Sequence, residues 1–178
     1  MTDPNAAGQG LVTLVLGGAR SGKSRYAEWL IGTYPKPWVY VATAQARDDE
    51  MAERIAAHIA RRDLGWQTVE APHAIAEAIE AATAGSAILV DCLTLWLSNL
   101  MEGDFDVAAQ TARLQQALSR RVGPVVLVSN EVGLGIVPDN ALARRFRDLQ
   151  GTLNQTLAAR SSRVIMMVAG IPVAVKSP

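Results

Sequence analysis

Short apolar runs alternate along the chain with alanine-rich stretches whose apolar residues recur every three or four positions. The apolar runs have the length and branched composition of buried strands. We expect strands at residues 11–16, 38–42, 66–70, 87–91, 125–130 and 164–168, with an edge strand at 173–175. We expect helices at residues 25–31, 48–62, 74–84, 93–101, 107–121 and 138–157. This alternation predicts a single α/β domain in which helices cover both faces of a mostly parallel sheet.

The first apolar run leads into a glycine-rich turn, Gly17-x-x-x-x-Gly22-Lys23-Ser24, which a helical stretch follows. This is the context of a phosphate-binding loop, in which backbone N–H groups and the positive end of the helix bind a polyphosphate. We expect Lys23 to reach the outer phosphates and the Ser24 hydroxyl to bind a bridging magnesium ion. The domain is therefore predicted to be P-loop NTPase-like. The expected nucleotide-binding residues of the loop are Gly17, Gly18, Ala19, Arg20, Ser21, Gly22, Lys23 and Ser24.

Carboxylates follow two of the predicted strands. Asp91 ends the apolar run at residues 87–91, which places it at the carboxyl edge of the sheet beside the phosphate loop. There it would share the magnesium ion with Ser24. Asp91 also precedes the helix expected at residues 93–101 and could cap it; the two roles are compatible, and both stay open. Glu131 falls at the same edge by position alone.

The composition limits the partners of the chain. Its 178 residues fit one domain, which we place at residues 11–178 after a flexible polar tail at residues 1–10. Seventeen basic and seventeen acidic residues give a formal net charge of zero, so an electrostatic footprint for nucleic acid or an anionic membrane is absent. No apolar run has the length of a membrane span, and the tail lacks the regions of a signal peptide. The single cysteine, Cys92, is expected in the core and suits a reducing cytoplasm.

The phosphate loop does not by itself identify the reaction. A GTPase switch requires an Asn-Lys-x-Asp segment that reads guanine, and the sequence contains none. The nearest segment, at residues 130–133, lacks both the lysine and the aspartate. A single-function kinase for a small metabolite and a non-catalytic nucleotide-dependent regulator both stay open at this point.

Several stretches together resemble one family. They are GGARSGKSR at residues 17–25, VATAQ at 41–45, DDEM at 48–51, Arg54-Ile55-x-x-His58, NEVGLGIVP at 130–138 and AR-x-FRD at 143–148. With these motifs, residues 11–176 resemble the bifunctional adenosylcobinamide kinase/adenosylcobinamide-phosphate guanylyltransferase of cobalamin synthesis. The phosphate loop occurs in many families, whereas the Glu-Val-Gly-x-Gly-Ile-Val-Pro stretch is much more specific.

The resemblance implies two reactions at one nucleotide site. In the first, the terminal phosphate of ATP or GTP passes to the hydroxyl of the aminopropanol arm of adenosylcobinamide. In the second, a histidine attacks GTP to give a guanylyl-enzyme and pyrophosphate. The GMP then passes to adenosylcobinamide phosphate and gives adenosylcobinamide-GDP. The implied partners are the corrinoid substrate and other copies of this chain in a homo-oligomer.

The histidine of the family matches His58, whereas His73, the other histidine of the chain, does not match the motif. Without the resemblance, a lone histidine on the helix expected at residues 48–62 is more often an exposed polar residue. A neutral imidazole suits attack on phosphorus because its unperturbed pKa is near 6.5. Basic residues on the same helix face could hold the triphosphate. The residues of that face, spaced by four, four and three, are Glu50, Arg54, His58 and Arg61.

The resemblance further implies that Thr43, Arg62 and Glu70 contact the nucleotide. Glu70 could accept hydrogen bonds from the N1–H and amino groups of guanine, a pairing that would reject adenine; the alternative is an acid on the surface at the end of a strand. At Asp91 this chain has an aspartate where other members of the family can carry glutamate, and either residue can serve magnesium.

Overall fold

The computed structural model describes residues 11–46, 49, 53, 56 and 64–177. Its strands are β1 (Val12–Gly17), β2 (Trp38–Ala42), β3 (Trp66–Glu70), β4 (Ala87–Asp91), β5 (Val125–Val128), β6 (Arg163–Val168) and β7 (Ile171–Lys176). Its helices are α1 (Lys23–Ile31), α3 (Ile75–Ala81), α4 (Leu93–Glu102), α5 (Val107–Arg120) and α6 (Ala141–Arg160). The tail expected at residues 1–10 lies outside the described residues, as does the helix expected at 48–62 apart from residues 49, 53 and 56.

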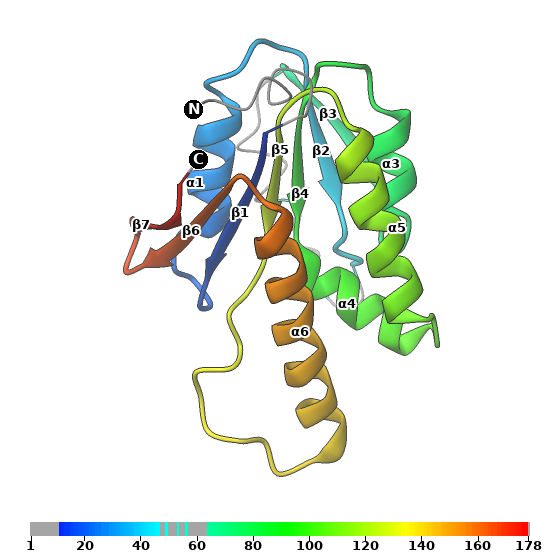
Figure 1. Ribbon diagram of the computed structural model, residues 1–178, viewed down its shortest axis with the longest axis vertical. Helices are drawn as coiled ribbons and strands as arrows, with labels where there is room; N and C mark the ends of the chain where they lie inside the picture. The colour runs from blue at the N-terminus through cyan, green and yellow to red at the C-terminus, as the bar shows by residue number, and fades with distance from the viewer. Residues whose placement is uncertain (1–10, 47–48, 50–52, 54–55, 57–63, 178) are drawn as a thin grey trace.

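The strands of the described residues form one seven-stranded sheet in the order β3-β2-β4-β5-β1-β6-β7 (Figure 1). All neighbouring strands are parallel except β6 and β7, which pair antiparallel at one edge. Every residue of β5 and four of the five residues of β4 are buried, as expected for parallel strands covered on both faces. The predicted α/β fold with a mostly parallel sheet is confirmed.

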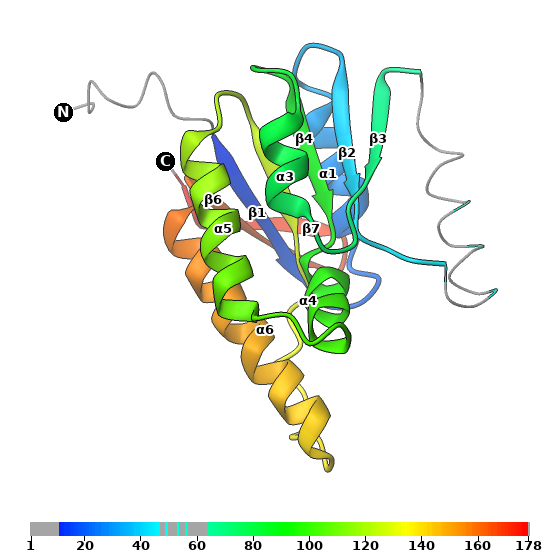
Figure 2. The same ribbon diagram turned by 90° about the vertical axis from the view of Figure 1, so that its right-hand side faces the viewer.

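Helices cover both faces of this sheet (Figures 1 and 2). On one face α1 buries Leu30 and Ile31 against strand residues that include Val15. On the other face α3, α4, α5 and α6 pack against strand residues that include Leu14. Adjacent residues of β1 thus enter two different cores, because side chains alternate across a strand. The carboxyl end of β1 leads directly into α1, so the turn between them lies at the edge of the sheet where ligands of such folds bind.

The helix α6 departs from its expected start. It begins at Ala141 rather than at Pro138, and the Asn140 side chain caps it by accepting a hydrogen bond from the Ala143 N–H (2.8 Å). The second half of its apolar face is buried at Leu153 and Leu157, whereas Leu142 in the first turn is 68% exposed. Figure 2 shows the reason, because the first turns of α6 extend beyond the sheet.

The buried guanidinium of Arg121 links segments at the amino-terminal edge of the sheet, opposite the edge that carries the turn between β1 and α1. Arg121 is 7% exposed and donates hydrogen bonds to the carbonyl oxygens of Ala82, Thr83 and Ser86. We expect Arg121→Leu to lower the free energy of unfolding by about 3 kcal/mol, because three carbonyls, that of Ser86 buried and those of Ala82 and Thr83 partly buried, lose a charged donor. The exposed ion pair of Arg113 provides the control, and Arg113→Gln should cost less than about 0.5 kcal/mol. Urea unfolding measures both changes, and equal costs would contradict the prediction.

Candidate nucleotide-binding site

The turn between β1 and α1 has the geometry of an anion-binding loop. Gly22 adopts φ +93°, a left-handed conformation that favours glycine, directly before the first residue of α1. The Tyr26 N–H donates to the Gly22 carbonyl (3.0 Å), as the helix requires. The N–H groups of the three residues in between precede the first helical hydrogen bond and have no acceptor within the helix. They supply the donors and the positive helix end that a polyphosphate needs.

Neighbouring segments hold this loop from two sides. The Glu131 N–H, beyond the end of β5, donates to the Gly17 carbonyl (3.0 Å). The Gly170 N–H, in the turn between β6 and β7, donates to the Ser21 carbonyl (3.1 Å). The two strands that flank β1 thus fix both ends of the loop, and the expected place of Glu131 beside the site is confirmed.

We expect Gly17→Ala to disrupt the loop. A Cβ at this position would lie 2.6 Å from the Ser21 Oγ and 2.7 Å from the Met167 carbonyl oxygen. Backbone must move to relieve these contacts, so the free energy of unfolding should fall by about 2 kcal/mol. Gly18→Ala is the matched control, because a Cβ there meets no protein atom within 4 Å. Urea unfolding of the two variants tests the prediction, and an unchanged Gly17→Ala stability would contradict it.

The ammonium group of Lys23 lies inside the loop. Lys23 is 8% exposed, and its Nζ donates to the Gly18 carbonyl (2.6 Å). Burial lowers the pKa of Lys23 below its usual value, while the nearby carboxylate of Asp91 acts in the opposite direction. A buried cation with few compensating groups has a strong attraction for an anion, which fits the role predicted for Lys23.

The carboxylate of Asp91 lies close enough to Lys23 to act on its pKa. It ends β4, as expected, and its Oδ2 accepts a hydrogen bond from the Tyr40 hydroxyl (3.2 Å). Cys92 holds the N-cap position of α4, and no side chain makes a capping hydrogen bond there, so Asp91 does not cap this helix. Its role toward magnesium stays a prediction. Ser24, in the first turn of α1, and Asp91 offer the hard oxygen ligands that magnesium takes beside substrate phosphates.

Thr43 joins the ends of β2 and β4. It is fully buried, and its Oγ1 accepts from the Cys92 N–H (2.7 Å) and donates to the Cys92 carbonyl (2.8 Å). The Asn99 side chain in turn donates to the Thr43 carbonyl (2.9 Å). These contacts fix the backbone that carries Asp91, while a direct contact of Thr43 with nucleotide stays a prediction.

Burial, with a smaller contribution from Asp91, raises the pKa of the Cys92 thiol to about 11, so at neutral pH this residue is an uncharged, poor nucleophile.

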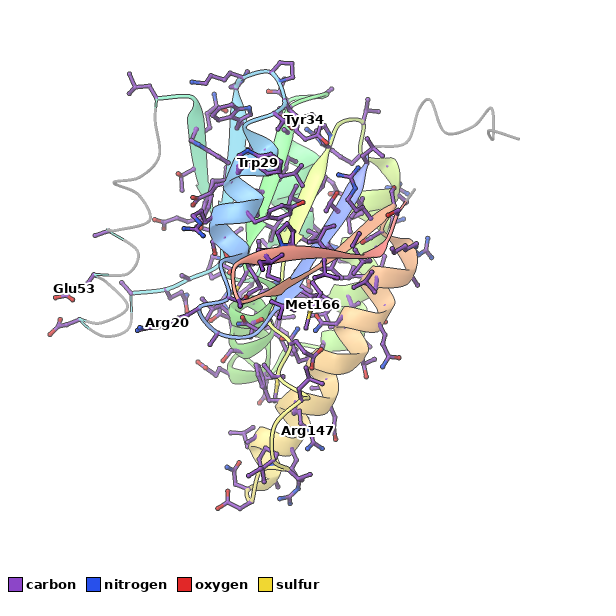
Figure 3. All side chains as sticks on the ribbon, turned by 90° about the vertical axis from the view of Figure 1, so that its left-hand side faces the viewer. Arg20, Trp29, Tyr34, Glu53, Arg147 and Met166 are labelled. Carbon is purple, nitrogen blue, oxygen red and sulfur yellow. The ribbon has the colours of Figure 1, made fainter. Side chains whose placement is uncertain are left out.

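The structure places the other predicted residues apart from this centre or leaves them undescribed. Arg20 adopts φ +55° and extends outward from the loop (Figure 3). Glu70 is exposed at the end of β3, four strand spacings or about 19 Å from β1. His58, Arg61 and Arg62 lie outside the described residues.

The sequence analysis missed a buried polar network behind the loop. The Ser129 hydroxyl donates to the Asn154 Oδ1 (2.7 Å), and the Gln150 amide donates to the Ser129 Oγ (2.9 Å). The Asn154 amide also donates to the Asn130 carbonyl (3.0 Å), which fixes the chain just before Glu131. The signal was present in the sequence, because Gln150 and Asn154 interrupt the apolar pattern of α6.

The chain matches a family described as cobinamide kinase/cobinamide phosphate guanyltransferase over residues 13–175. The bifunctional adenosylcobalamin biosynthesis protein CobP of Pseudomonas aeruginosa is 49% identical over 166 residues, with 92% of this chain and 96% of the relative covered. The bifunctional adenosylcobalamin biosynthesis protein CobU of Salmonella typhimurium is 44% identical, with 93% of this chain and 100% of the relative covered. The resemblance drawn from the motifs is confirmed.

A more distant likeness concerns the fold alone. The KaiC-like protein PH0186 of Pyrococcus horikoshii has a TM-score of 0.52 and 16% identity, with 89% of this chain and 72% of that chain covered. It supports the P-loop NTPase-like architecture. In the part of the chain that the structure describes, no helix combines the length and apolar character needed to cross a membrane.

Proposed function

The chain belongs to the cobinamide kinase/cobinamide phosphate guanyltransferase family, and we propose that it phosphorylates adenosylcobinamide with ATP or GTP and then transfers GMP to the product. The family match over residues 13–175 carries this proposal. The phosphate loop supports it, because both reactions require a bound nucleoside triphosphate. The sequence also lacks the Asn-Lys-x-Asp segment with which GTPase switches bind guanine, which agrees with an enzyme of this kind rather than a switch.

For the kinase step, the loop positions the triphosphate rather than reacting with it. Its N–H groups and Lys23 neutralise charge on the outer phosphates, which favours transfer of the terminal phosphoryl group to the substrate hydroxyl. Magnesium, held by Ser24, Asp91 and the phosphates, would neutralise further charge when bound. The tie between Thr43 and Cys92 keeps Asp91 in place for this role.

For the transfer step, we assign the nucleophile to His58. A neutral imidazole nitrogen attacks the α-phosphorus of GTP, a P–N bond forms, and the bond to the β-phosphate breaks to release pyrophosphate. A phosphate oxygen of adenosylcobinamide phosphate then attacks the same phosphorus, and the P–N bond breaks. Arg61 and Arg62 would help to hold the triphosphate during the first attack.

Glu70 is proposed to select guanine in the transfer step. Its carboxylate can accept from the N1–H and amino groups of guanine, whereas adenine offers no such donor pair. Since Glu70 lies about 19 Å from β1 across the sheet, the nucleotide must extend along the carboxyl edge of the strands to reach it.

The assembly of the chain into a homo-oligomer and its cytoplasmic location also stay predictions.

Labelled GTP tests the proposal. Purified protein incubated with GTP labelled at the α-phosphate should gain an acid-labile label that maps to the peptide carrying His58. Addition of adenosylcobinamide phosphate should discharge the label into adenosylcobinamide-GDP. A protein that phosphorylates a metabolite but never becomes labelled would be a single-function kinase. One that binds nucleotide and makes no product from any corrinoid would be a regulator.

A further inference from the structure

An open groove of about 270 Å³ runs along α1 next to the phosphate loop. It lies between α1 and the hairpin formed by β6 and β7, on the face of the sheet that α1 covers (Figure 3). The site described above leaves this groove unused. Its lining residues are Gly22, Arg25, Tyr26, Trp29, Met167 and Gly170.

Two aromatic side chains dominate the groove. Trp29 is 63% exposed, whereas Trp38 and Trp96 are buried and Trp66 is partly buried, so it is the most exposed of the four tryptophans. The ring of Tyr26 lies 5.5 Å from that of Trp29 at an angle of 36°. The two residues lie three positions apart on one helix face, which turns both rings toward the same side of α1. Flat aromatic surfaces of this kind stack against nucleobases of any sequence.

The groove is continuous with the phosphate loop through Gly22, which belongs to both. In a phosphate loop the lysine reaches the outer phosphates, so the α-phosphate lies toward the first N–H groups of the helix. The nucleoside attached to that phosphate leaves the loop beside the first turns of α1, where the side chains of Arg25 and Tyr26 begin the groove. The exposed guanidinium of Arg25 supplies the positive charge that suits an adjoining phosphate.

We propose that this groove binds the base and ribose of the nucleoside triphosphate that donates the phosphoryl group in the kinase step. The base stacks on Trp29 and Tyr26, and Arg25 contacts the α-phosphate. The inference rests on the proposed function for its reaction, although the nucleotide site itself does not require the corrinoid.

The lining is compatible with either purine as donor. The six lining residues include no carboxylate or amide side chain that could read the edge of a base. Stacking alone is tolerant of base identity, so ATP and GTP should bind in the groove with similar affinity. Guanine selection is left to Glu70, on the opposite side of β1 in the sheet. One phosphate loop therefore serves two nucleoside positions, one along α1 for phosphorylation and one across the sheet for guanylyl transfer.

Calorimetric titration of the purified chain separates the groove from the loop. The ligands are ATP, GTP and inorganic tripolyphosphate, which has neither base nor ribose. Trp29→Ala should weaken ATP and GTP by about tenfold each and leave tripolyphosphate unchanged. Val122→Ala is the control. Val122 is an apolar residue that is 58% exposed, and it lies away from the groove, just before β5 at the amino edge of the sheet. It should change none of the three affinities.

Three results would overturn the proposal. ATP affinity could be unchanged in Trp29→Ala, or ATP and tripolyphosphate could weaken equally, which would indicate a disturbed loop. Alternatively, Trp29→Ala could change the oligomeric state in sedimentation without changing ATP affinity, which would make the groove a contact between copies of the chain. If the wild-type chain phosphorylates no corrinoid while the base-dependent loss at Trp29 persists, the proposed function fails and the groove assignment stands.

Discussion

Lys23→Ala is expected to reduce both the kinase and the guanylyl transfer rates by about a thousandfold. In the proposed mechanism the buried ammonium binds the outer phosphates, and loss of one preorganised donor in such a site typically costs a factor of a hundred to a thousand. Both reactions should slow because each needs a triphosphate held in this loop. Initial rates with adenosylcobinamide, and covalent labelling by GTP, measure the two effects.

Stability measurements distinguish this chemical role from a structural one. Burial of the Lys23 ammonium opposes its charged form, so its removal should leave the free energy of unfolding unchanged or raise it. Lys36→Ala is the charge-matched control. Lys36 is exposed, lies before β2 at the amino edge of the sheet, and stands over the Trp38 ring at 4.8 Å from its centroid. Intact guanylyl transfer in Lys23→Ala would contradict a site shared by both reactions.

The sheet and the phosphate loop were predictable because their determinants are local. Branched apolar runs indicate strands wherever they occur, and the spacing from Gly17 to Lys23 is read within a single turn. Alternation with helices then favours parallel strands, which places the loop and Asp91 at one edge. The structure confirms that Asp91 lies near Lys23, although neither sequence motif contains information about the other.

Contacts between segments distant in sequence were not predictable in the same way. The Thr43 hydroxyl forms hydrogen bonds with the backbone of Cys92, 49 residues later in the sequence. This contact depends on β2 and β4 being neighbours in the sheet. The polar network of Ser129 with Asn154 similarly requires α6 to lie behind β5. The exposure of Leu142 follows from where the sheet ends rather than from the helical pattern. The groove beside Trp29 arises from the β6–β7 hairpin, whose approach to α1 no single motif encodes.

His58→Ala is expected to abolish covalent labelling by GTP and the formation of adenosylcobinamide-GDP, while phosphorylation of adenosylcobinamide continues. In the proposed mechanism, only the transfer step breaks the bond at the α-phosphorus through a nucleophile of the protein, whereas the kinase step uses the hydroxyl of the substrate. The loss should be complete because alanine provides no nucleophile at this position. Labelling with α-labelled GTP and a separate assay of γ-phosphate transfer measure the two outcomes.

His73→Ala is the matched control, since His73 is the other histidine of the chain. Its ring stacks on Phe105 at 4.9 Å between centroids, and its carbonyl accepts from the Trp96 indole N–H (2.8 Å), so it has a structural environment of its own. This variant should keep both activities, with at most a loss of stability from the partly exposed stack. A label that survives in His58→Ala and disappears in His73→Ala would identify His73 as the nucleophile and contradict the assignment to His58. Loss of both reactions in His58→Ala would instead make the histidine part of nucleotide binding, and the separation of the two steps would have to be abandoned.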